Sequence, residues 1–198
     1  MLIQDTQVSK RFVYIMVATL ILGSCQKELS PEEYVSWVNN PENGLRISQT
    51  LGDFEVEVKY EPAEYNEAMT HLKDLNQSNP EYSEYEHFQF RIKSLIGGDI
   101  LRYKENQTNN EVTRINHFSF NSKSDFKVIV GADTNDCKLS VYSRNYNLSP
   151  TIDLSMSFNK MEKSQDWQFI YSDKEFNLGT LKFMFRKEDL NSIPLLVI

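Results

Sequence analysis

The sequence predicts an α+β fold in one domain, in which one main amphipathic helix packs on a curved, mostly antiparallel sheet. Three observations support this prediction. A stretch with helical periodicity covers about residues 62–75, most other segments alternate between apolar and polar residues, and short turn-forming clusters join them. The chain has 198 residues, 40% of them hydrophobic and 25% charged, which is typical of a globular protein and argues against extensive disorder.

The N-terminal segment has the layout of a secretory signal. Lys10 and Arg11 precede an apolar run at residues 12–22, and two small residues and a cysteine follow at 23–25. The run has about half of the roughly 20 apolar residues that a transmembrane helix needs. Export is therefore expected, either as a lipoprotein or, alternatively, as a soluble secreted protein.

Residues 22–25, LGSC, resemble the lipobox of bacterial lipoproteins. The resemblance implies cleavage between Ser24 and Cys25, and attachment of a diacylglycerol and a further acyl chain such as palmitate at Cys25. It divides the chain into a signal peptide at 1–24, a short tether at 25–29 and one domain at 30–198. Residues 26–28, QKE, resemble the surface-export signal of some Gram-negative lipoproteins, with a solvated linker as the alternative. The expected location is the outer membrane.

Charge and cysteine content restrict the partners. The chain carries −7, and removal of residues 1–24, with Asp5, Lys10 and Arg11, changes this to −8. Such acidity disfavours nucleic acid and electrostatic adhesion to an anionic membrane, so the lipid is the expected membrane contact. With Cys25 acylated, Cys137 has no intramolecular partner and is expected to be a small buried group.

The first half of the chain predicts two helices and several strands. Ser30, Pro31 and Glu33 form a capping box that starts a helix ending near Asn39. Alternating residues at 45–51 and 54–60 flank Gly52-Asp53 and predict a hairpin. The main helix carries an apolar stripe of Tyr65, Ala68, Met69, Leu72 and Leu75.

The second half predicts mainly strands. Residues 87–96 alternate, with Ile96 on the apolar face, and Gly97-Gly98 is expected to turn the chain into a strand at 100–103. A helical turn is expected at 111–115 and a turn at 133–136. The apolar C-terminal residues 190–198 are expected to dock on the domain. Further strands are expected at 116–120, 126–130, 136–143, 151–158, 167–171 and 179–185.

No catalytic, metal or cofactor motif stands out. His71, His87 and His117 do not have the spacing of metal ligands, and no serine lies in a GxSxG turn. Residues 133–136 lack the glycine and glutamate of a calcium loop. We therefore expect no cofactor, no metal and no enzymatic activity.

Aromatic side chains supply the candidate binding surface. The chain has twelve Phe, ten Tyr and two Trp. Trp167, Tyr142, Tyr146 and Tyr171 are candidates for a stacking surface, together with Tyr82 and Tyr85, and core packing is the alternative. Segments 137–142, 146–150 and 176–179 resemble small uncharacterised envelope lipoproteins of Gram-negative bacteria, which implies a shared fold and no particular activity.

The sequence therefore predicts a lipid-anchored envelope protein that acts as a non-catalytic binding or assembly module for an envelope protein or a glycan. The alternative is an envelope hydrolase that cleaves glycan or peptide through acidic residues.

Overall fold

The computed structural model describes residues 27–74, 80–103, 110–144 and 149–198. Their fold is α+β in a single domain, as predicted, and the larger sheets are antiparallel and not closed. The five-stranded sheet has the order β2 (Arg46–Leu51), β3 (Phe54–Glu61), β4 (Tyr85–Ser94), β8 (Thr151–Asn159) and β7 (Leu139–Tyr142). The four-stranded sheet has the order β10 (Thr180–Phe185), β9 (Trp167–Ser172), β5 (Phe126–Val130) and β6 (Asp133–Asp136).

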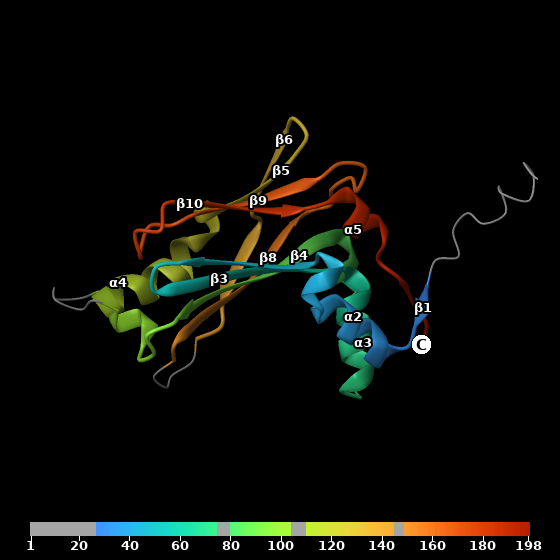
Figure 1. Cartoon of the computed structure of the whole chain (residues 1–198), viewed down its shortest axis with the longest axis horizontal. Coiled ribbons are helices and arrows are strands. Elements are labelled where there is room, and N and C mark those ends of the chain that lie inside the picture. Colours follow the sequence, from blue (N-terminus) through green and yellow to red (C-terminus); the bar gives the residue numbers. More distant parts are fainter. Residues whose placement is uncertain (1–26, 75–79, 104–109, 145–148) are drawn as a thin grey trace, which may run out of the picture.

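The core lies between these two sheets, which Figure 1 shows as two layers. Alternation along β4 turns Phe88, Phe90 and Ile92 inward. The ring of Phe88 lies 5.2 Å from that of Phe169 on β9, and the Phe90 ring lies 5.0 Å from Phe126 on β5. Because burial of one such side chain contributes about 2–3 kcal/mol, this aromatic layer contributes strongly to the packing of the two sheets.

Helices close both ends of the two layers (Figure 1). α2 (Pro31–Asn39) and α3 (Ala63–Leu72) pack together at one end, and α4 (Asn110–Asn116) lies at the other. The predicted capping box of α2 is present, with the Ser30 backbone N–H donating to Glu33 Oε2 at 3.1 Å. On α3, Tyr65 and Ala68 are buried whereas Leu72 is partly exposed, so the buried stripe ends before Leu72. α5 (Lys187–Asn191) follows β10.

The two ends of the described chain pair with each other. β1 (Glu28–Leu29) runs parallel to β11 (Leu195–Leu196), and Leu29 is buried. The apolar C-terminal segment is docked as expected, and two residues expected in the tether belong to the folded unit. Ser24 and Cys25 lie outside the described residues.

Three segments differ from the expected structure. Residues 100–103 do not form a strand, because Asp99 Oδ1 accepts from the Leu101 N–H and starts a single 3-10 turn, η3 (Ile100–Arg102). Ile96, expected on the apolar face, is 67% exposed in the turn that precedes η3. The expected turn at 133–136 is strand β6, which pairs with β5.

The remaining segment is 116–120, where a strand was expected. Here the chain instead continues from α4 into a single π-helical turn, η4 (His117–Asn121). Arg114, His117 and Phe118 are buried and recur at helical spacing, while Phe120 is exposed. A 3-10 turn, η5 (Ser122–Asp125), then leads into β5. The short 3-10 turns η1 (Pro41–Asn43) and η2 (Pro80–Glu84) precede β2 and β4.

Among the described helices, none has the length and apolar character needed to span a bilayer. The apolar run at residues 12–22 lies outside the described residues.

Candidate functional site

Two of the four aromatic residues proposed as a binding surface, Trp167 and Tyr171, lie in the core instead. Trp167 and Tyr171 are fully buried, because alternation on β9 turns both toward the opposite sheet. The Trp167 indole N–H donates to the Glu162 carbonyl at 2.8 Å, and the Tyr171 hydroxyl donates to Asp173 Oδ1 at 2.8 Å. Tyr142 is half-buried and packs on Phe118, whereas Tyr146 lies outside the described residues. The prediction is therefore wrong for Trp167 and Tyr171.

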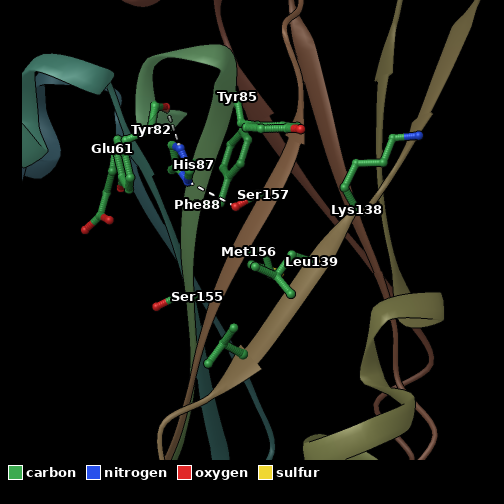
Figure 2. A pocket seen from close by; sticks show the side chains of 11 residues that line it. Glu61, Tyr82, Tyr85, His87, Phe88, Lys138, Leu139, Ser155, Met156 and Ser157 are labelled. Carbon is green, nitrogen blue, oxygen red and sulfur yellow. Dashed lines mark hydrogen bonds between the residues drawn. The ribbon is translucent and has the colours of Figure 1, made fainter. Parts of the chain in front are cut away.

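A groove on the outer face of the five-stranded sheet is the better candidate. It has a volume of about 540 Å³ and is lined by residues of β4, β7 and β8, with Tyr82 of η2 and Glu61 of β3 (Figure 2). We call it the tyrosine groove, after Tyr82 and Tyr85. The register of the strands determines which side chains line the groove. His87 of β4 pairs with Ser157 of β8, and Ser157 pairs with Leu139 of β7, so these three side chains lie in one row across the sheet.

His87 lies at the centre of the groove, and its contacts define its protonation state and tautomer. Its ring stacks on Tyr82 at 3.5 Å between centroids, and its Nε2 lies 2.8 Å from the Tyr82 carbonyl oxygen. A carbonyl only accepts, so Nε2 carries the proton. Burial lowers the pKa of His87 below its usual value, against the raising effect of its hydrogen bond to the Tyr82 carbonyl. The imidazole is therefore neutral at pH 7, and Nδ1 accepts from the Ser157 hydroxyl at 3.1 Å.

Apolar surface flanks this polar centre. Tyr85 is 38% exposed, Leu139 is 54% exposed and Val141 is 47% exposed, and all three line the groove. Leu139 and Val141 lie on β7, which is the edge strand of its sheet among the described strands. Exposed apolar side chains that share a groove with hydroxyl groups are typical of a ligand site.

The charged side chains of the groove lie at its ends. In Figure 2, the carboxylate of Glu61 and the ammonium group of Lys138 lie on opposite sides of the Ser157 hydroxyl, and each is directed away from it. Glu61 Oε1 is 2.8 Å from Lys59 Nζ and is therefore neutralised within the domain. The middle of the groove thus carries polar groups without net charge.

His117, the first residue of η4, lies in a second, largely buried charge cluster. His117 Nε2 is 2.5 Å from Asp125 Oδ2, and Lys174 Nζ is 2.5 Å from Asp125 Oδ1. Asp125 also accepts from the Ser124 hydroxyl at 3.4 Å, and its own side chain is fully buried. Each oxygen of Asp125 thus has a partner within the protein, so the carboxylate has little capacity left for a substrate.

The rest of this cluster ties three segments together. Arg114 donates to the carbonyls of Leu101 and Tyr103 at 2.8 and 2.9 Å, and its guanidinium lies 4.8 Å from the centre of the Phe176 ring. Burial raises the pKa of Glu175, while His117 and Arg114 oppose the shift. These contacts fasten α4 and η4 to the neighbouring turns, which is a structural role.

The remaining candidate groups offer little reactivity. Among the described residues, no group of three or more His, Cys, Asp or Glu side chains lies close enough to hold a metal ion. Cys137 is buried as expected, and burial raises the pKa of its thiol to about 11. The thiol is therefore protonated at neutral pH and is a poor nucleophile.

The Ser157–His87 contact resembles a nucleophile beside a base, with the Tyr82 carbonyl fixing the base. Acyl transfer also needs N–H donors for the oxyanion. Ser157 lies on β8 between β4 and β7, and an interior strand uses its backbone N–H groups in the ladders on both sides. The backbone N–H groups next to Ser157 are therefore engaged in the ladders and are not available as donors to an oxyanion.

Sequence reasoning missed this pair because its members are 70 residues apart and meet only through strand register. The available signal was the outward position of His87 in the alternation of β4 and of Ser157 in that of β8. No protein-family model, no curated protein and no solved structure matches this chain.

Proposed function

We propose that this protein is an outer-membrane lipoprotein, anchored through Cys25, whose domain is a non-catalytic binding module for an envelope component. The ligand binds in the tyrosine groove. The observation that carries the proposal is the combination, in one groove, of exposed apolar side chains with a neutral histidine–serine pair.

Two features favour binding over hydrolysis. The Ser157–His87 pair lies within a regular sheet, where backbone N–H donors are already used. The buried carboxylate of Asp125 is engaged by His117 and Lys174. A hydrolase acting through acidic residues needs a carboxylic acid and a carboxylate that both face the substrate.

The position of β1 affects how the anchor would hold the domain. Glu28 is already paired with Leu195, so three residue steps separate it from Cys25. At about 3.5 Å per residue, this distance is at most ~10 Å. Two or more acyl chains at Cys25 would therefore hold the domain close to its membrane.

The anchor is tested by metabolic labelling with an alkyne analogue of palmitate in the native host. We expect the wild-type chain to incorporate label and Cys25→Ala to incorporate none, because Cys25 is the expected acylation site. Cys137→Ala is the matched control and retains the label, since its thiol is buried. Equal labelling of wild type and Cys25→Ala would refute the anchor.

The groove is tested by crosslinking the tagged, full-length protein in intact cells and comparing what is recovered with it. We expect Leu139→Asp to lose the recovered component, because a charge would replace exposed apolar surface in the groove. Met184→Asp is the control, because it changes an exposed apolar side chain on β10 of the other sheet. This variant should still recover the crosslinked component. The hydrolase would be favoured instead if the wild-type protein cleaved envelope glycan or peptide and Glu61→Ala did not.

A further inference from the structure

We propose that the ligand of the tyrosine groove is a neutral saccharide, of which one hydroxyl donates a hydrogen bond to Ser157 Oγ while the apolar face of the ring packs on Tyr85. This inference rests on the proposed binding function and names the chemical class of its ligand.

The hydrogen-bond polarity of the groove is the first argument. Tyr82 holds the proton of His87 on Nε2, and Nδ1 accepts from Ser157 at 3.1 Å. The single proton of the Ser157 hydroxyl is thereby used inside the protein, so Ser157 offers a ligand only its lone pairs. The ligand must therefore supply a donor at this point, and a sugar hydroxyl does so.

The charge distribution is the second argument. Glu61 is paired with Lys59, and the charged groups of Glu61 and Lys138 lie at opposite ends of the groove, away from its centre (Figure 2). A charged group placed in the middle would lose hydration without gaining an opposite charge. The groove therefore complements a ligand with hydroxyl groups and no net charge.

The apolar walls are the third argument. Tyr85, Leu139 and Val141 expose carbon surface beside the hydroxyls of Ser155 and Ser157. A pyranose has a face of C–H groups and a rim of hydroxyls, and it satisfies both kinds of surface at once. An aromatic ring also loses little conformational entropy when a ligand packs on it.

The first experiment measures retention of the full-length protein, in phospholipid nanodiscs, on an array of neutral oligosaccharides and their uronic-acid counterparts. We expect neutral oligosaccharides to be preferred. Ser157→Ala should weaken binding about tenfold through loss of the acceptor, and Tyr85→Ala by a similar factor through loss of stacking. Ser48→Ala, at an exposed position on β2 at the other edge of the same sheet, is the control and should leave binding unchanged. Thermal melting of each variant verifies that it is folded.

The second experiment tests the polarity. In the best neutral ligand, each hydroxyl is replaced in turn by fluorine, which cannot donate. At one position, the replacement should lower the affinity for the wild-type protein about tenfold. The same replacement should not lower the affinity for Ser157→Ala, which lacks the acceptor. A fluorine scan without such a position would overturn the assigned polarity and with it the proposal.

The outcomes separate this inference from the proposed function. Absence of binding to any neutral oligosaccharide at millimolar concentration, or equal binding by folded Ser157→Ala and Tyr85→Ala, would overturn the saccharide. If Leu139→Asp nevertheless abolished crosslinked recovery of an envelope protein, the groove would still be the binding site and its ligand would be a polypeptide. If neither assay responded to groove variants, both proposals would fail.

Discussion

His87 and His117 illustrate how the same residue type serves two different purposes in one domain. Both are partly or fully buried, and both contact an oxygen within 2.8 Å. His117 lies between the carboxylates of Asp125 and Glu175, with its Nδ1 3.8 Å from Glu175 Oε1. His87 instead lies between a backbone carbonyl and a hydroxyl, on the floor of an open groove.

The difference lies in the hydrogen-bonding capacity that each site leaves unused. Around His117, the carboxylate of Asp125 is occupied by partners within the protein, so the cluster can only hold segments together. Around His87, the Ser157 oxygen retains lone pairs and the neighbouring apolar side chains remain exposed. A polar network whose hydrogen-bonding groups are all paired within the protein stabilises the fold. A network that lies beside a groove and retains an unused acceptor is suited to binding a ligand.

The largest effect should come from Asp125→Ala. This change leaves the buried His117 without its nearest carboxylate and removes the partner of the half-exposed Lys174, and we expect a loss of about 3 kcal/mol in the free energy of unfolding. Urea denaturation followed by circular dichroism measures it. Asp136→Ala, at an exposed position on β6, is the control and should change stability by less than about 0.5 kcal/mol. A small loss in Asp125→Ala would show that the cluster does not stabilise the fold.

A smaller effect is expected from the protonation of His87. Because its folded-state pKa is lowered from about 6.5, the unfolded chain binds protons more readily than the folded one. Stability is therefore complete above pH 6.5 and is lost as the pH falls through the folded-state pKa. Among the surrounding charges, the carboxylates of Glu61 and Glu86 raise the pKa of His87, and the ammonium group of Lys160 lowers it.

The measurement is the difference in unfolding free energy between pH 7.5 and pH 5.5 for wild type and for His87→Gln. Glutamine keeps a donor and an acceptor at this position but does not titrate. We expect the wild type to lose more stability than the variant over this interval. An equal loss would mean that other groups cause the pH dependence and that His87 is not held neutral by the fold.

The smallest effect on stability should come from Tyr85→Ala. Tyr85 is exposed at the groove, so its removal should change the free energy of unfolding by less than about 0.5 kcal/mol while it weakens ligand binding. Urea denaturation of wild type and variant in parallel measures this. A loss comparable to that of Asp125→Ala would show that Tyr85 belongs to the core rather than to a binding surface.

Local patterns predicted much of the fold. The capping box placed α2, the Gly52-Asp53 turn placed the hairpin of β2 and β3, and alternation placed β5, β8, β9 and β10. These features depend on residues close together in sequence. The same patterns failed at 116–120, where two alternating phenylalanines suggested a strand, because the burial of Arg114 and His117 in the charge cluster favours a continued helix.

The candidate site could not be predicted in the same way. Alternation shows that Trp167 and Tyr171 share a face of β9, but it does not show that this face is covered by the opposite sheet. Likewise, nothing near His87 in the sequence indicates that Ser157 lies beside it. That pairing depends on which strands are neighbours and on their register, which the packing of the whole core decides.

The sequence by itself determined the α+β class, the positions of most elements and the expectation of a lipid at Cys25. These follow from local periodicity, turn chemistry and a short motif. Only the tertiary structure decided that Tyr85, Leu139 and Ser157 share a groove while Trp167 belongs to the core. The physical reason is that a side chain's own strand fixes only which of two faces it occupies, whereas the elements packed against that face decide whether it meets protein or solvent.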